Sequence, residues 1–238
     1  MSIQAEDQKK APFIVAVDGT AGSGKSSICS TACGRKSWAY INTGSLYRAV
    51  AYLVEQQHID PHDESKLCDF MTKESIYLRW NFEKEAIFFI EKNLKPYLYS
   101  EKIGQVASSI AKHPNLRKVL LPIQKELIKD CSSHVLIVEG RDIGSVVIPD
   151  APLKIFMSAS IEERAKRRLK QLEEEVSHEN LPSINDLVED IRKRDQQDSK
   201  RKTSPLIKSE DAVDFDTSDK NFEECVADLI ILVEKNIK

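Results

Sequence analysis

The sequence predicts an α/β protein built on a doubly wound parallel sheet of about five core strands. Apolar, β-branched runs recur along the 238-residue chain, as expected of strands that are buried on both faces of a sheet. Segments with helical periodicity separate these runs. A glycine-rich loop directly follows the first run, at the sheet edge where such proteins bind ligands.

The expected elements alternate along the chain. The predicted strands are Phe13–Val17, Trp38–Ile41, Val135–Val138, Leu153–Met157 and, more weakly, Val213–Phe215. The predicted helices include Ser26–Cys33, Ser45–Gln56, Ile161–Glu175 and Asn221–Asn236. The last of these begins with the spacing of a capping box, an asparagine followed three residues later by Glu224.

The pattern changes in the first half of the chain. Two short strand-like pieces, Ile76–Trp80 and Ala86–Ile90, are joined by a polar turn at residues 81–85. This arrangement predicts an antiparallel hairpin within an insertion.

Composition excludes several functional classes. The formal net charge is −3, so the molecule as a whole lacks the positive field that would hold a nucleic-acid polymer. The five cysteines contain no Cys-x-x-Cys pair, which argues against a disulfide framework or a zinc site. Residues 1–10 lack an apolar signal region, and no apolar run approaches the roughly 20 residues that span a bilayer. We expect a cytoplasmic monomer with no membrane partner.

The glycine-rich loop carries the strongest motif. Residues 19–26 match G-x-x-x-x-G-K-[ST] between a predicted strand and a predicted helix, which is the context that a P-loop requires. Backbone N–H groups of such a loop cradle phosphates, while Lys25 reaches the β- and γ-phosphates and the Ser26 hydroxyl ligates Mg²⁺. The predicted ATP-binding residues are Gly19, Thr20, Ala21, Gly22, Ser23, Gly24, Lys25, Ser26 and Ser27.

A P-loop alone is compatible with GTPases, motor or regulatory ATPases and small-molecule kinases. The Asn-Lys-x-Asp segment with which GTPases read guanine is absent from the sequence, and the chain is short for a motor or ring ATPase. A kinase is therefore the favoured class.

Four further segments narrow the acceptor. They are Asn42–Arg48, Val138–Gly144, Pro149–Phe156 and Arg194–Arg201, the last followed by Ser-Pro-Leu. Together with the P-loop, and in the same order and spacing, they resemble the bacterial cytidylate kinase family of nucleoside monophosphate kinases. The resemblance extends from about Phe13 to the C-terminal helix.

The resemblance implies roles for particular residues. Arg48, Arg141 and Arg201 would hold the acceptor phosphate, since guanidinium groups match phosphate oxygens bidentately. It further implies that Ser108, Arg117 and Asp142 face the cytosine, that Arg194 and Asp198 reach the ribose, and that Thr43 and Tyr47 border the acceptor. The catalytic charges would come from Lys25, Arg141, Arg201 and Arg168, the last in a basic stretch whose Arg164 and Arg167 also resemble lid arginines.

Four positions depart from the family pattern. Asn42 and Glu139 each stand where the family usually has an aspartate, and Gln197 and Tyr99 stand where it often has an arginine. These differences bear on the rate and on the geometry of the Mg²⁺ site.

The resemblance also implies a domain organisation and a reaction. A single kinase domain would have its core at residues 12–43, 134–160 and 205–238, an acceptor-binding insertion at 44–133 and a lid at 161–204. Its reaction would be Mg²⁺-assisted transfer of phosphate from ATP to CMP, and to dCMP, giving ADP and the diphosphate. Two alternatives remain: a kinase acting on UMP or shikimate, and a regulatory protein that binds ATP as a switch without catalysis.

Overall fold

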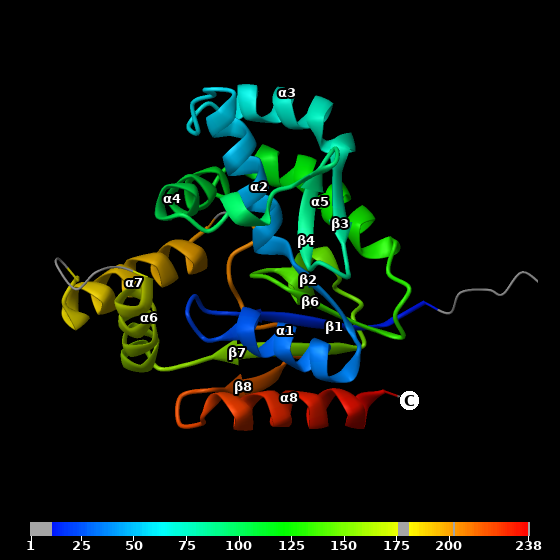
Figure 1. The fold of residues 1–238 in the computed structure, drawn as a ribbon, viewed down its shortest axis with the longest axis vertical. Coiled ribbons are helices and arrows are strands. Elements are labelled where there is room, and N and C mark those ends of the chain that lie inside the picture. The colour runs from blue at the N-terminus through cyan, green and yellow to red at the C-terminus, as the bar shows by residue number, and fades with distance from the viewer. Residues whose placement is uncertain (1–10, 176–180, 202, 238) are drawn as a thin grey trace, which may run out of the picture.

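The core of the molecule is a five-stranded parallel sheet, as the sequence predicts. The computed structural model describes residues 11–175, 181–201 and 203–237. The strands are β1 (Phe13–Gly19), β2 (Ala39–Asn42), β6 (Val135–Glu139), β7 (Leu153–Ser158) and β8 (Val213–Asp216). Their order is β2-β6-β1-β7-β8, with β1 in the centre (Figure 1). The N-terminal residues 1–10 lie outside the described residues.

Helices cover both faces of this sheet because side chains alternate along each strand. Val15 and Val17 of β1 are fully buried against α1 (Lys25–Lys36) and α8 (Phe222–Asn236). Ala16 points to the other face, where the core includes Ile128 of α5 (Pro114–Lys129) and the short helical turn at Ile143–Val147. The apolar runs in the sequence therefore correspond to strands buried on both faces.

An insertion between β2 and β6 forms a second lobe with its own core, seen above the sheet in Figure 1. Besides α5, its elements are α2 (Thr43–Gln56), α3 (Glu64–Glu74), β3 (Leu78–Asn81), β4 (Ala86–Phe89), β5 (Lys92–Asn93) and α4 (Glu101–Ile110), with 3₁₀ turns at Ser75–Tyr77 and Lys95–Tyr97. The predicted hairpin is confirmed as β3–β4. Its first strand begins at Leu78, because the two preceding residues belong to a 3₁₀ turn, and the two-residue β5 was not predicted.

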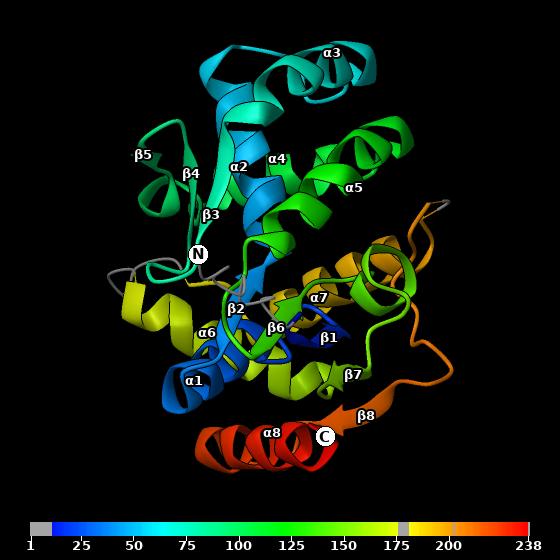
Figure 2. The same cartoon turned by 90° about the vertical axis from the view of Figure 1, so that its right-hand side faces the viewer.

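Two helices form a third part beside the P-loop end of the sheet. They are α6 (Ile161–Glu175), which has the predicted bounds, and α7 (Ile184–Ser199). The two helices contact each other; they lie at the left in Figure 1 and behind the sheet in Figure 2. Helix α7 begins at a capping box between Ser183 and Asp186. Arg194 and Asp198 lie on this helix, whereas Arg201 lies beyond its end.

Local capping determines where α2 and α8 begin. The Asn42 side chain accepts from Ser45 N at 3.2 Å, so α2 begins at Thr43, two residues earlier than predicted. The expected capping box of α8 is confirmed, with Asn221 and Glu224 exchanging hydrogen bonds at 2.9 and 3.0 Å. Helix α1 continues to Lys36, beyond its predicted end. Trp38 is buried, but it precedes the strand β2 rather than beginning it.

No helix among the described residues has the length and apolarity needed to cross a bilayer. The five cysteines are free thiols, and four of them are buried.

Candidate active site

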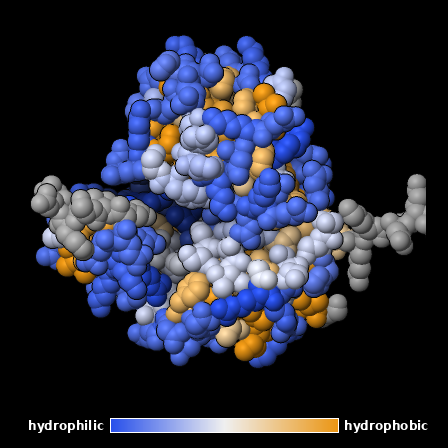
Figure 3. Space-filling view, viewed as in Figure 1, coloured by the Kyte–Doolittle hydropathy of each residue, from blue (hydrophilic) through white to orange (hydrophobic). Residues whose placement is uncertain are grey.

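A cavity of about 1220 Å³ lies where the P-loop, the insertion and the helices α6 and α7 meet. The hollow between the upper lobe and the rest of the molecule is visible in Figure 3. All ten residues predicted on the acceptor side line this cavity: Thr43, Tyr47, Arg48, Ser108, Arg117, Arg141, Asp142, Arg194, Asp198 and Arg201. Lys25, Ser26 and Arg168 line it as well. Of the predicted P-loop residues, Gly19, Thr20 and Ser23 do not line it.

The glycines of the P-loop allow a backbone that other residues could not adopt. Gly19 has φ +152°, and a Cβ atom there would lie 1.8 Å from the Met157 carbonyl oxygen of the neighbouring strand. Gly24, with φ +87°, precedes α1 in the left-handed region. These two positions bend the chain sharply from β1 into α1, which is why the motif requires glycine.

The N-terminus of α1 has the features of an anion-binding site. No side chain caps this helix, and no acidic residue lies in its first turn. The helix itself therefore supplies no negative group to its leading N–H groups or to the positive end of its dipole. Phosphate is the ligand that such a terminus favours.

Lys25 is the first residue of α1 and is folded back onto the loop. Its Nζ donates to the carbonyl oxygens of Gly19 at 2.9 Å and Thr20 at 2.7 Å, and the residue is only 4% exposed. Burial, and after it the positive charge of Arg141, lower the pKa of Lys25 to about 7 against the opposing effect of Glu139. The ammonium group is thus costly to keep charged until an anion arrives.

A buried carboxylate lies next to the Ser26 hydroxyl. Ser26 Oγ donates to Glu139 Oε1 at 2.8 Å, and the Tyr40 hydroxyl donates to Glu139 Oε2. Asn42 Nδ2 approaches Ser26 Oγ at 3.3 Å. The group combines hydroxyl and carboxylate oxygens, the ligand types that Mg²⁺ prefers.

A second carboxylate stabilises the turn after β6. Asp18, at the end of β1, accepts from the backbone N–H groups of Ile143 at 2.7 Å and Gly144 at 2.8 Å. Burial raises its pKa to about 6, although these two donors lower it. Asp18 therefore holds the segment that carries Arg141 and Asp142 against the end of β1.

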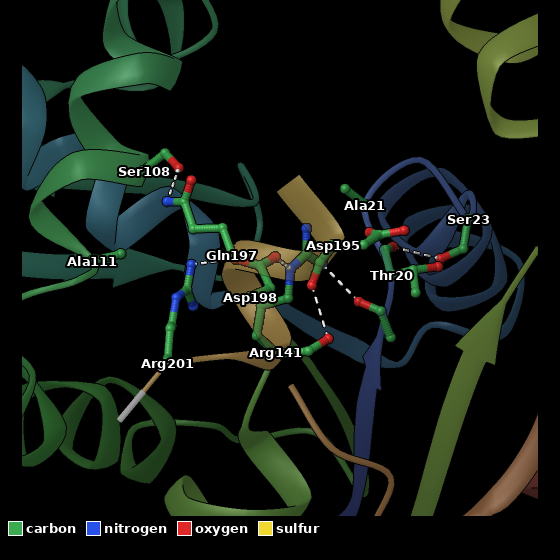
Figure 4. Close-up of polar contacts among 12 residues, drawn as sticks. Thr20, Ala21, Ser23, Ser108, Ala111, Arg141, Asp195, Gln197, Asp198 and Arg201 are labelled. Atoms are coloured by element: carbon green, nitrogen blue, oxygen red, sulfur yellow. Dashed lines mark hydrogen bonds and ion pairs between the residues drawn. The ribbon is translucent and has the colours of Figure 1, made fainter. Parts of the chain in front are cut away.

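Arg141 and Arg201 are held together by one carboxylate, as Figure 4 shows. Arg141 Nε donates to Asp198 Oδ2 at 3.0 Å and its NH1 to Gly19 O at 2.8 Å, while Arg201 NH2 donates to Asp198 Oδ1. Asp198 is 2% exposed. This arrangement offsets the repulsion between the two guanidinium groups and connects the acceptor side to the P-loop.

Arg117 and Asp142 form a buried ion pair. Arg117 NH2 donates to Asp142 Oδ2 at 2.6 Å, and the two residues are 6% and 5% exposed. The guanidinium also lies 5.3 Å from the centre of the Tyr47 ring, within cation–π distance. Arg117 Nε has no hydrogen-bond partner among the described residues. The pair therefore presents both donor and acceptor atoms inside the cavity.

Two of the residues that depart from the family pattern, Gln197 and Tyr99, contact side chains that line the cavity. Gln197 Nε2 donates to Ser108 Oγ at 3.4 Å, a contact that spans from α7 to α4 (Figure 4). The Tyr99 ring lies 5.4 Å from the Arg48 guanidinium, and its hydroxyl is 3.2 Å from Ser45 Oγ. Tyr99 thus packs against an acceptor-side arginine instead of adding a charge.

The three arginines of α6 that were expected to belong to a lid differ in their contacts. Arg164 donates to Ala21 O at 3.0 Å and pairs with Asp195 at 2.7 Å, so it joins α6 to both the P-loop and α7. Arg167 donates to Thr217 O at 2.7 Å. Arg168 is exposed and makes no hydrogen bond with the described residues, which leaves its charge available to a ligand.

Four residues of this site were not predicted from the sequence: Asp18, Tyr40, Asp195 and Thr217. Asp18 directly precedes the P-loop motif, and this position at a strand end was an available signal. The other three meet partners more than 20 residues away in the sequence, so no local spacing could indicate them.

Comparisons with known proteins agree with this geometry. The family model described as cytidylate kinase matches residues 15–235. A cytidylate kinase of Bacillus subtilis (strain 168) is 36% identical over 217 residues, covering 91% of this chain and 94% of its own. One from Geobacillus sp. (strain WCH70) is 35% identical over 223 residues, covering 94% of this chain and 97% of its own. These matches show, for a chain whose P-loop and arginines Arg48, Arg141 and Arg201 line one cavity, that it belongs to the cytidylate kinase family.

Proposed function

We propose that the protein transfers the γ-phosphoryl group of ATP to CMP and to dCMP, with Mg²⁺ as the cofactor. The observation that carries this proposal is that the P-loop and the buried Arg117–Asp142 pair line the same cavity. The P-loop provides a binding site for a triphosphate. The ion pair provides hydrogen-bond donors and acceptors that can recognise a base.

On the donor side, the N-terminus of α1 and the P-loop amides bind the phosphates of ATP. Lys25 leaves the carbonyl oxygens of Gly19 and Thr20 and binds the β- and γ-phosphates. Their negative charge raises its lowered pKa, so the ammonium group is protonated in the complex. Ser26 would hold Mg²⁺, and its hydrogen bond to Glu139 fits this role because the hydroxyl donates its proton there and keeps a lone pair beside the one that accepts from Asn42. When bound, the ion neutralises charge on the phosphates.

On the acceptor side, Asp142 accepts from the N4 amino group of cytosine, and Arg117 donates to the ring carbonyl and N3. Arg48, Arg141 and Arg201 bind the acceptor phosphate and bring it toward ATP. Asp198 fixes Arg141 and Arg201, and with Arg194 it is placed to meet the ribose hydroxyls. The acceptor phosphate oxygen then attacks the γ-phosphorus in line, without a covalent intermediate on the protein.

The helices α6 and α7 act as the lid in this proposal, with the insertion as the acceptor-binding part. Arg168 approaches the transferring phosphoryl group when the lid closes. Closure removes water, which would otherwise hydrolyse ATP.

The protein acts in the cytoplasm and as a monomer in this proposal. Its five cysteines are all free, as in a reducing compartment. One chain supplies every group that the proposed reaction uses, so catalysis does not require a second copy.

Nucleotide binding is expected to take up about one proton at pH 8. Lys25 has a pKa of about 7 in the free protein and must be charged to meet a triphosphate, so its pKa rises on binding. Affinity should be highest below about pH 7 and should then fall by up to about tenfold per pH unit. Titration calorimetry with ADP in buffers of different ionisation enthalpy measures the uptake. Lys25→Met should remove it, and uptake retained in that variant would contradict the assignment.

A panel of acceptors tests the reaction. With ATP and Mg²⁺, ADP formation should depend on CMP or dCMP, and UMP should be at least about 10²-fold poorer, because it lacks the amino donor that Asp142 requires. Faster turnover with shikimate or UMP would indicate another kinase. ATP binding without acceptor-dependent ADP formation would indicate a nucleotide-binding regulator.

A further inference from the structure

The Tyr40 side chain is placed to control the carboxylate beside Ser26. Glu139 is 6% exposed, and each of its oxygens has a protein donor: the Ser26 hydroxyl at 2.8 Å for Oε1 and the Tyr40 hydroxyl for Oε2. No other carboxylate hydrogen-bonds Ser26 among the described residues. Asn42, the nearby polar residue, contributes only a neutral amide at 3.3 Å.

Tyr40 itself has little freedom to move. It is 5% exposed and packs in the core beneath the sheet. Its carbonyl oxygen accepts from Trp80 Nε1 at 3.0 Å, and it pairs with Ile137 in the register of β2 with β6. The same register places Asn42 beside Glu139, so the phenol reaches the carboxylate from the neighbouring strand. The buried Tyr40 ring on β2 can therefore hold the more flexible Glu139 side chain on β6 in one orientation.

Glutamate needs such an anchor more than aspartate does. It has one more rotatable bond, so a carboxylate on this side chain loses more rotamer freedom when it is fixed in one direction. With Oε2 held by Tyr40, Oε1 faces Ser26 and accepts its only proton. One lone pair of the Ser26 oxygen accepts from the Asn42 amide, and the other stays available to a cation.

We propose that Tyr40 is a positioning residue for the Mg²⁺ site, acting through Glu139 on Ser26. The inference rests on the role proposed above for Ser26. It assigns to a tyrosine in the core of the sheet a function that Asn42 and Glu139 could not perform alone. Residues that hydrogen-bond a metal-binding group typically change metal affinity by about 10- to 100-fold when they are replaced.

The test compares Tyr40→Phe with the parent protein, using ADP without an acceptor and Mn²⁺ as a paramagnetic probe. Electron paramagnetic resonance measures free Mn²⁺, and calorimetry in EDTA measures metal-free ADP binding. Tyr40→Phe should weaken Mn²⁺ binding in the ADP complex by about tenfold or more while leaving metal-free ADP binding within twofold. The matched control is Tyr52→Phe, which removes a hydroxyl that contacts Lys92 in the insertion and should change neither quantity.

A double-mutant comparison tests whether Tyr40 acts through Glu139. In Glu139→Gln, which loses the carboxylate, adding Tyr40→Phe should cause much less than the tenfold loss that it causes alone, because the two residues act as one unit. Full additivity would overturn the coupling.

Three other results would overturn the proposal in distinguishable ways. If Tyr40→Phe weakens metal-free and Mn²⁺-dependent binding equally, Tyr40 is only part of the fold. If Ser26→Ala loses Mn²⁺ affinity but Tyr40→Phe does not, the metal role of Ser26 stands and that of Tyr40 fails. Unchanged Mn²⁺ affinity in Ser26→Ala would remove the premise itself.

Discussion

Lys25→Met is expected to lower kcat for CMP phosphorylation by about 10³-fold or more. In the proposed reaction its ammonium group meets the phosphates next to the transferred phosphoryl group, where loss of a single positive charge has an effect of this order. Turnover is measured by coupled ADP formation at saturating ATP and CMP.

The fold should survive this substitution. Both carbonyl oxygens that Lys25 contacts keep another donor, Arg141 for Gly19 and Ser23 for Thr20. The variant also removes an amine whose charge is disfavoured by burial, so the melting temperature at pH 7 should not fall. Lys36→Met, at the exposed end of the same helix, is the matched control and should retain parental activity. Turnover of Lys25→Met within threefold of the parent would contradict the role proposed for Lys25.

Asp142→Asn is expected to lower the preference for CMP over UMP by about 10²-fold. The asparagine keeps the size of the side chain and can still accept from Arg117, but its amide no longer offers a carboxylate to the N4 amino group of cytosine. A hydrogen bond to a charged group contributes about 1.5–3 kcal/mol, which corresponds to a factor of this order. The same amide can donate to the O4 atom of uracil, so UMP turnover should not fall.

The measurement is kcat/KM for each nucleotide, together with the KM for ATP, which should not change. Asp142 is half of a buried ion pair, so the melting temperature of the variant must be compared with that of the parent. Asp150→Asn, at an exposed position, is the control. An unchanged ratio of CMP to UMP in a folded Asp142→Asn variant would mean that other residues read the base.

Much of the fold was predictable because it depends on residues close together in the sequence. The apolar run of β1 followed by the glycines of the P-loop determines a strand, a turn and a helix start within 14 residues. The capping box at Asn221 and Glu224 and the hairpin of the insertion are equally local. In each case, backbone angles and hydrogen bonds within a few residues suffice to select the structure.

The candidate site was predictable as a set of residues but not as a set of contacts. The resemblance named Arg141, Asp198 and Arg201 separately, with ligand roles for each. The structure shows that one carboxylate holds both arginines. The ion pair between Arg164 of α6 and Asp195 of α7 could not be predicted, because no local sequence pattern indicates which residue pairs with which.

The sequence by itself was enough to predict the P-loop motif, the parallel sheet and the motif residues that the chain shares with the family. Only the tertiary structure decided which side chains share a buried partner and how strongly burial perturbs them. The lowered pKa of Lys25 and the link from Tyr40 through Glu139 to Ser26 both arise where strands and helices distant in sequence exclude water from one place. The cost of leaving a charge or a donor unpaired there depends on everything packed around it, which no short stretch of sequence specifies.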